Sequence, residues 1–110
     1  MDYGLEPGVI NSINRVLAAH PEIEQAILYG SRAKGNYRVG SDIDLCLLGE
    51  DLTVTQLLKI GNDLDDLLLP YKIDLLLFHT LDNTELIEHI QRVGVVFYSA
   101  SADRAPLNSI

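Results

Sequence analysis

The sequence is poor in the residues from which disulfide-bonded, nucleic-acid-binding and membrane-spanning proteins are built. Its 110 residues include one cysteine, no tryptophan, and 8 Lys and Arg against 16 Asp and Glu, for a formal net charge of −8. One cysteine cannot form an internal disulfide, and so acidic a chain repels the phosphates of long nucleic acid. The apolar runs are too short to cross a membrane, and we see no signal peptide. We therefore expect a cytoplasmic protein without a long nucleic-acid or membrane partner.

The length limits how the chain can be organised. A chain of 110 residues can form one hydrophobic core, but it has no room for a separate domain that would hold a second substrate. The sequence therefore predicts one folded domain over residues 1–98. Residues 99–110 are mostly polar and contain Pro106, and we expect them to form a mobile C-terminal tail unless a partner orders them.

Apolar periodicity predicts helices alternating with strands. One helical stripe runs from about Leu5 to Ala19, and a second runs up to Pro70. Short apolar runs bounded by turn residues predict strands at residues 25–29, 42–48, 72–78 and 95–98. The expected fold class is α/β (α+β), with a mixed β-sheet of about four strands flanked by helices.

Polar residues predict where two of the helices begin. Asp51 or Thr53 can cap the second helix. We assign its buried stripe to Leu57, Ile60, Leu64, Leu67 and Leu68. Asp82, with Glu85 three residues later, predicts the start of a last helix that ends near Gly94.

A turn at Gly30-Ser31 follows the first predicted strand. Glycine has no Cβ to keep a ligand away from the backbone, and Ser31 adds a hydroxyl donor. A helical turn that begins here would direct its backbone N–H groups at an anion. Arg32 and Lys34 follow at once and could contact a triphosphate, although exposed bases in loops are common. We predict that Gly30, Ser31, Arg32 and Lys34 bind a nucleotide, and that Tyr37 and Arg38 only cover the loop.

Three aspartates occupy strand positions downstream of this turn. Side chains alternate along a strand, so Asp42 and Asp44 project to the same side and can share a hard cation. Asp74 lies inside an apolar strand, where an unpaired carboxylate would be costly. A salt bridge to a neighbouring base is the structural alternative for Asp74, and a solvated strand edge is the alternative for the first two. We predict that Asp42, Asp44 and Asp74 are catalytic and hold two Mg²⁺ ions, for which Mn²⁺ can substitute.

The remaining polar residues predict no second site. His20, His79 and His89 share no ligand spacing with one another or with Cys46, which argues against zinc. Asp63, Asp65 and Asp66 lie on the second helix, where a solvated face is the simpler interpretation.

Gly30-Ser31, a ten-residue spacer and Asp42-Ile43-Asp44 resemble the nucleotidyltransferase signature of the DNA polymerase β superfamily. The segment from Leu28 to Gly35 is similar to the minimal nucleotidyltransferase (MNT) branch, and Asp74 occupies the place of the family's third carboxylate. The resemblance implies a polymerase β palm-like fold and a prokaryotic cytoplasmic antitoxin. It also implies a HEPN-type toxin as partner, which is neutralised when AMP from ATP is transferred to its tyrosine.

Three functional hypotheses follow from these residues. The first is metal-dependent transfer of AMP to a partner protein, with in-line attack at the α-phosphorus of ATP. The second is a non-catalytic antitoxin that occludes its partner. The third is transfer to a small molecule such as an aminoglycoside, which the lack of an acceptor domain disfavours. An oligomer is compatible with each of them.

Overall fold

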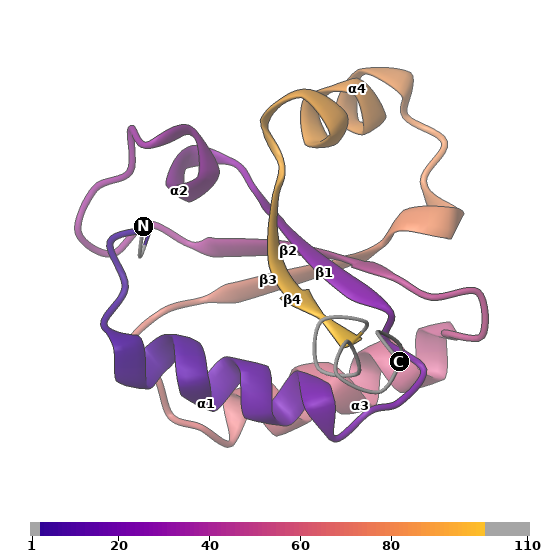
Figure 1. Ribbon diagram of the computed structural model, residues 1–110, viewed down its shortest axis with the longest axis horizontal. Coiled ribbons are helices and arrows are strands. Elements are labelled where there is room, and N and C mark those ends of the chain that lie inside the picture. Colours follow the sequence, from indigo (N-terminus) through magenta and orange to yellow (C-terminus); the bar gives the residue numbers. More distant parts are fainter. Residues whose placement is uncertain (1–2, 101–110) are drawn as a thin grey trace, which may run out of the picture.

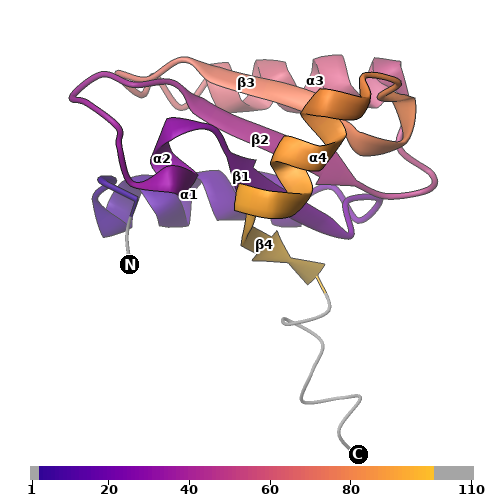
Figure 2. The ribbon, with the colours of Figure 1, turned by 90° about the horizontal axis from the view of Figure 1, so that it is seen from above.

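The computed structural model describes residues 3–100 and contains one four-stranded sheet with helices on both faces. In chain order the elements are α1 (Pro7–Ala18), β1 (Gln25–Tyr29), α2 (Ser31–Lys34), β2 (Ile43–Leu48), α3 (Val54–Asp65), β3 (Ile73–Leu77), the 3₁₀ turn η1 (Phe78–Thr80), α4 (Thr84–Val93) and β4 (Val95–Ser99). Helices α1 and α3 lie on one face, and α4 lies over the other (Figures 1 and 2). The expected mixed sheet flanked by helices is confirmed.

The sheet has the strand order β3-β2-β1-β4. Strand β1 pairs antiparallel with both β2 and β4, whereas β2 and β3 are parallel. A parallel pair needs a long crossover connection, and α3 supplies it. The parallel register places residues 44 and 74 directly opposite each other.

The core lies between the sheet and the α1/α3 layer. Apolar side chains of alternate strand positions point into this layer and are fully buried: Ala26, Leu28, Ile43, Leu45 and Leu47. Helices α1 and α3 contribute Ile13, Leu17, Ile60 and Leu64 to the same core. Cys46 is a buried free thiol that points to the other face of β2. No helix in the described part of the chain has the length and apolar character needed to cross a bilayer.

The second helix differs in part from its prediction. Thr53, rather than Asp51, is the N-cap, and it forms a capping box with Gln56. The helix ends at Asp65, five residues before Pro70. Leu68 was predicted to be in the buried stripe, but it has a positive φ of 56° and is 86% exposed. The helical repeat therefore does not reach Leu68, because the chain has already turned out of the helix.

Three other boundaries also differ. Asn83, not Asp82, caps α4, because its side-chain oxygen accepts the backbone N–H of Leu86 at 3.1 Å. The first helix begins at Pro7, a favourable first residue because its missing N–H would have no helical partner. Strand β4 includes Ser99, which we had assigned to the tail. Ala100 is also described, and its N–H donates to the Glu24 carbonyl at 3.0 Å, whereas residues 101–110 of the predicted tail lie outside the described residues.

Candidate active site

The turn after β1 requires glycine. Gly30 has a φ of 76° and a ψ of −158°, a backbone conformation that residues other than glycine rarely adopt. A Cβ atom at this position would collide with a carboxylate oxygen of Asp44 on the neighbouring strand. The backbone of Gly30 therefore lies directly against the Asp44 side chain, and this contact joins the predicted phosphate turn to the predicted carboxylate site.

Helix α2 is a single short turn that follows this contact. The N–H of Lys34 donates to the Gly30 carbonyl at 3.1 Å, and the N–H of Gly35 donates to the Ser31 carbonyl at 2.9 Å. Gly35 then ends the helix in the left-handed conformation. The first backbone N–H groups of a helix have no partner within it, and here they follow directly after Gly30.

Strand register brings Asp44 and Asp74 together. They are opposite each other across the parallel β2/β3 pair, and Tyr29 is opposite Asp44 on the antiparallel side. Burial raises the pKa of the Asp44 carboxyl, and the charges of Asp74 and Asp42 and a hydrogen bond with Asp74 raise it further. Asp42 is exposed and lies just before β2. The carboxylates therefore repel one another and favour a cation or a shared proton.

The salt-bridge alternative for Asp74 is also present. Lys72 Nζ lies 3.7 Å from an oxygen of Asp74, and the two side chains are 72% and 43% exposed. An ion pair this open to solvent is weak. Lys72 therefore does not remove the repulsion that Asp44 experiences from Asp74.

Arg32 occupies a different environment from the one its nucleotide-binding prediction requires. Its side chain is 2% exposed, and its guanidinium donates to the Ser41 carbonyl at 2.8 and 3.1 Å and to the Tyr3 carbonyl at 3.0 Å. The guanidinium carbon also lies 5.3 Å and 5.0 Å from the ring centroids of Tyr37 and Tyr71. In this arrangement Arg32 holds the loop after α2 to the N-terminal segment, and the nucleotide contact that we expected of it stays a prediction.

Lys34, by contrast, is exposed at the end of α2. Its position leaves its ammonium free to move toward an anion bound near Gly30. The contact predicted for Lys34 therefore remains a proposal.

Two aromatic residues beside the carboxylates were not among the predicted site residues. Burial, followed by the charge of Asp44, raises the pKa of the Tyr29 hydroxyl well above its usual range. His89 of α4 meets the Tyr29 ring edge-on, with ring centroids 6.2 Å apart, and its charge when protonated lowers the pKa of Asp44. Tyr29 could have been found from its place directly before Gly30, but His89 could not, because its position depends on how α4 crosses the sheet.

His20 and His79 have structural partners. Nε2 of His20 lies 2.9 Å from an oxygen of Asp63, so Asp63 is not merely solvated as predicted. Nε2 of His79 lies 2.9 Å from the Leu52 carbonyl oxygen. These contacts tie the segment after α1 to α3, and η1 to the loop before α3.

The donor set fits a hard divalent cation in its chemistry. Oxygen ligands are what Mg²⁺ and Mn²⁺ prefer, and the negative charges of Asp74 and Asp42 add to the effect of burial in raising the pKa of Asp44. Within residues 3–100, however, no three His, Cys, Asp or Glu side chains are already arranged as a metal site. Asp44 and Asp74 form the close pair, and Asp42 would have to turn toward them.

Residues 11–103 match the family described as "Polymerase beta, Nucleotidyltransferase". The chain belongs to this nucleotidyltransferase family. The match includes the Gly30 turn and all three aspartates, so the resemblance seen in the sequence is confirmed.

One curated relative of this nucleotidyltransferase is the "Putative protein adenylyltransferase MJ1547" of Methanocaldococcus jannaschii. The two are 40% identical over 76 residues, which is 60% of this chain and 62% of the relative. The matched segment thus spans less than two thirds of the relative's own length.

Solved structures of toxin-antitoxin complexes share the fold of this nucleotidyltransferase. A chain of a toxin-antitoxin crystal structure with AMP-PNP superimposes with a TM-score of 0.68 at 24% identity, over 86% of this chain and 76% of that one. A chain from a tri-AMPylated Shewanella oneidensis HEPN toxin in complex with MNT antitoxin gives 0.65 at 20% identity, over 92% and 78%. At these identities the likeness shows a common fold.

Proposed function

We propose that this nucleotidyltransferase moves AMP from ATP to a tyrosine hydroxyl of a HEPN-type toxin and thereby acts as its antitoxin. The observation that carries the proposal is the contact between the Gly30 backbone and Asp44, with Asp74 opposite Asp44 across the sheet. A phosphate-binding turn and a carboxylate pair in direct contact suit transfer of a phosphorus group. The curated relative is named for the same chemistry, and the solved complexes join a related fold to a HEPN toxin.

The reaction forms one phosphorus–oxygen bond and breaks another. The tyrosine oxygen attacks the α-phosphorus of ATP, the bond to the bridging oxygen breaks, and pyrophosphate leaves with the electron pair. Asp74 accepts the phenolic proton, which is accessible because the pKa of tyrosine is about 10. Backbone N–H groups after Gly30, the Ser31 hydroxyl and Lys34 hold the phosphates and stabilise the leaving charge.

A divalent cation is the cofactor that we assign to this site. Asp42, Asp44 and Asp74 would hold Mg²⁺, or Mn²⁺ in its place. With two ions bound, one would neutralise charge on the triphosphate and the other would lower the pKa of the acceptor hydroxyl. The chain's own contribution is to hold the carboxylates together at the strand ends. We further propose that the protein works in a prokaryotic cytoplasm.

Intact mass measurement tests the proposal. The protein is incubated with ATP, Mg²⁺ and a HEPN-type protein from the same genome, and we expect that protein to gain one or more adenylate masses. The double variant Asp42→Asn and Asp44→Asn should abolish the gain, whereas Asp65→Asn, an exposed position on α3, should preserve it. If the partner is bound and silenced but carries no adenylate, the protein acts by occlusion instead. Occlusion is the second candidate function, and the fold shared with a chain of a solved toxin-antitoxin complex is compatible with it.

A further inference from the structure

The sheet face that carries Asp44 and Asp74 continues into a hollow that the proposed chemistry does not use. Two adjoining cavities, of about 200 and 380 Å³, share Leu48 at the end of β2 and Phe78 at the start of η1. The first also touches Glu24, Glu50 and His79. The second extends under the C-terminal end of α4, where Ile90 and Gly94 line it. We call the two cavities together the acid-rimmed hollow.

The floor of the acid-rimmed hollow is apolar and incompletely covered. Ile27, Leu48 and Phe78 are only partly buried, although they lie on a sheet face. Val96, paired with Ile27 on the edge strand β4, is 53% exposed and extends the apolar surface. An apolar side chain placed on this floor would remove apolar area from water, which favours binding.

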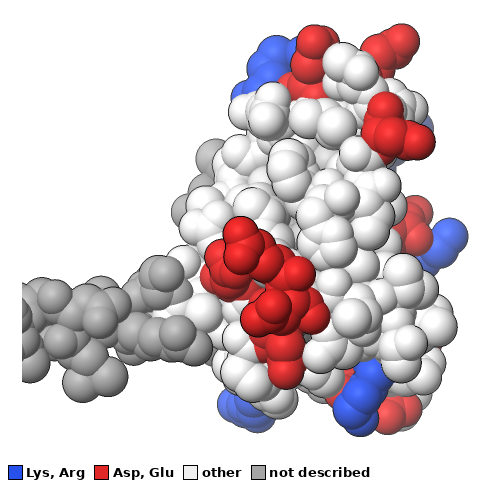
Figure 3. All heavy atoms as spheres, turned by 90° about the vertical axis from the view of Figure 1, so that its right-hand side faces the viewer, with Lys and Arg blue, Asp and Glu red and all other residues white. Residues whose placement is uncertain are grey.

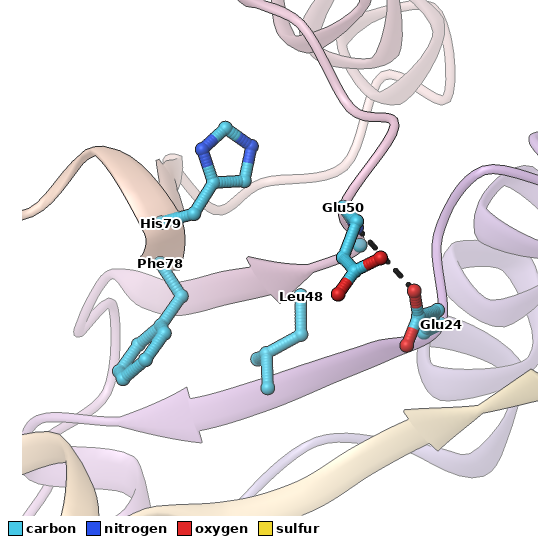
Figure 4. A pocket seen from close by; sticks show the side chains of 6 residues that line it. Glu24, Leu48, Glu50, Phe78 and His79 are labelled. Carbon is cyan, nitrogen blue, oxygen red and sulfur yellow. Dashed lines mark hydrogen bonds between the residues drawn. The ribbon is translucent and has the colours of Figure 1, made fainter.

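The rim is negatively charged. The backbone N–H of Glu50 donates to a carboxylate oxygen of Glu24 at 3.3 Å, so the two residues lie side by side at the mouth (Figure 4). Both side chains are exposed, and no Lys or Arg is among the described residues that line either cavity. Figure 3 shows Asp and Glu gathered in one patch on the side of the molecule where β1 begins and β2 ends. Such a rim attracts a basic partner and repels an acidic one.

The hollow and the carboxylate pair are within reach of one partner surface. Asp44 and Leu48 point to the same face of β2 and are four residues apart, a separation of about 13 Å along a strand. One face of a small helical protein can cover both places at once. A second copy of this chain would instead bring its own excess of acidic residues to an acidic rim.

We infer that the acid-rimmed hollow docks the acceptor protein by receiving an apolar side chain flanked by lysine or arginine. This inference rests on the proposed function, because it assigns the hollow to the protein whose tyrosine is modified. It adds a docking point remote from the reacting atoms, so that affinity for the acceptor and chemistry at Asp44 are separable.

A peptide titration followed by NMR tests the chemistry of the hollow directly. The probe is the capped peptide Lys-Lys-Phe-Leu-Arg-Lys, and its matched control is Glu-Glu-Phe-Leu-Glu-Glu. We expect the basic peptide to shift the backbone amide signals of Gly49, Glu50 and Gly94 and to leave that of Gly40, in the loop after α2, unchanged. Equal shifts with the acidic peptide, or shifts centred on Gly40, would overturn the inference.

Charge reversal tests the hollow against the whole acceptor. The double variant Glu24→Lys and Glu50→Lys should weaken binding of the HEPN-type protein about tenfold or more, with ATP binding unchanged. The matched control Asp66→Lys and Asp82→Lys changes the net charge equally at exposed positions outside the hollow and should keep wild-type affinity. Equal losses in both variants would overturn the inference, as would a dimer of the wild-type chain that the hollow variant abolishes. If the wild-type chain does not bind ATP, that result would count against the proposed function and not against the docking surface.

Discussion

The two faces of the sheet are built from the same strands but are used in opposite ways. On the α1/α3 face the central strands β1 and β2 contribute fully buried aliphatic side chains, such as Leu28 and Leu45. On the α4 face the sheet presents Asp44, Asp74 and partly buried apolar residues, and one helix of ten residues covers them. The molecule derives its stability from the first face and leaves the second open to ligands.

The contrast explains why carboxylates can be tolerated inside strands. A fully buried, unpaired carboxylate would cost several kcal/mol in a core of this size, roughly the stability of a small domain. On the open face, solvent reaches Asp74 and lowers that cost. The remaining penalty at Asp44 makes the site ready to bind a positive charge.

Adding one methyl group to Gly30 should have the largest effect on the open face. In Gly30→Ala the new Cβ would collide with Asp44, so either the turn or the carboxylate must move. We expect loss of adenylate transfer by about a hundredfold or more, since a small misplacement at a reacting centre costs that much. Intact mass time courses measure the rate.

Gly35→Ala is the matched control for this variant. Gly35 also has a positive φ, but within residues 3–100 no atom other than those of its own neighbours in the chain lies within 4 Å of its Cβ position. It should lose stability from backbone strain and retain transfer. If both variants retained transfer, the contact between the Gly30 turn and Asp44 would not matter for function.

Truncating one leucine on each face compares their contributions to stability. Leu28→Ala should lower the free energy of unfolding by about 2–5 kcal/mol, because the side chain is fully buried in the α1/α3 core. Leu48→Ala, on the open face, should cost about 1 kcal/mol, because that side chain is only partly buried. Urea unfolding followed by circular dichroism gives both values. Equal costs would show that α4 packs its face as tightly as α1 and α3 pack theirs.

Arg32 separates loop structure from phosphate binding. Arg32→Lys keeps the positive charge. It cannot reproduce the two hydrogen bonds to the Ser41 carbonyl or the contacts of the guanidinium with the rings of Tyr37 and Tyr71. We expect a loss of about 1–3 kcal/mol in the free energy of unfolding, since the partly buried carbonyls of Ser41 and Tyr3 lose donors. Arg38→Lys, an exposed neighbour, should cost nothing measurable. A stable Arg32→Lys protein with weakened ATP binding would support the nucleotide-binding role.

The smallest effect concerns the pH dependence at Asp44. Its folded-state pKa lies above the unfolded value, so ionisation opposes folding: the carboxyl's contribution is fully present below the unfolded pKa and is lost as pH rises through the folded pKa. Asp44→Asn has no carboxyl at this position, so it does not lose this contribution to stability as the pH rises. We expect its melting temperature to exceed that of the wild type at pH 7, with the difference shrinking toward pH 4. A difference that grows on acidification would contradict the raised pKa.

Local patterns were sufficient to predict most of the fold. The strand at Gln25–Tyr29 occurs as predicted because an apolar run between Pro21 and Gly30 has few alternatives. Leu68 was misassigned because periodicity alone does not show where a chain leaves the helix, which here happens after Asp65. Asn83 was missed because Asp82 and Asn83 are equally good caps and only the backbone geometry chooses between them.

The site was predictable only where it depends on neighbours in the sequence. The turn at Gly30 follows from local rules, whereas the predicted alternation of Asp42 with Asp44 does not apply, because β2 begins only at Ile43. The environment of Arg32 does not, because Tyr3 and Tyr71, which contact it, are distant from it in the sequence. The contact of His89 with Tyr29 likewise depends on tertiary packing.

The buried thiol of Cys46 makes the open face observable at a single atom. It is the only cysteine in the sequence, it is fully buried two residues beyond Asp44, and burial raises its pKa to about 11. A thiol in this state reacts with alkylating reagents only when the sheet around it opens, because the thiolate is the reactive form. The rate at which Cys46 is alkylated therefore reports how often the sheet opens beside the carboxylates. A ligand that bridges Asp44 and Asp74 would lower this rate without contacting the sulfur.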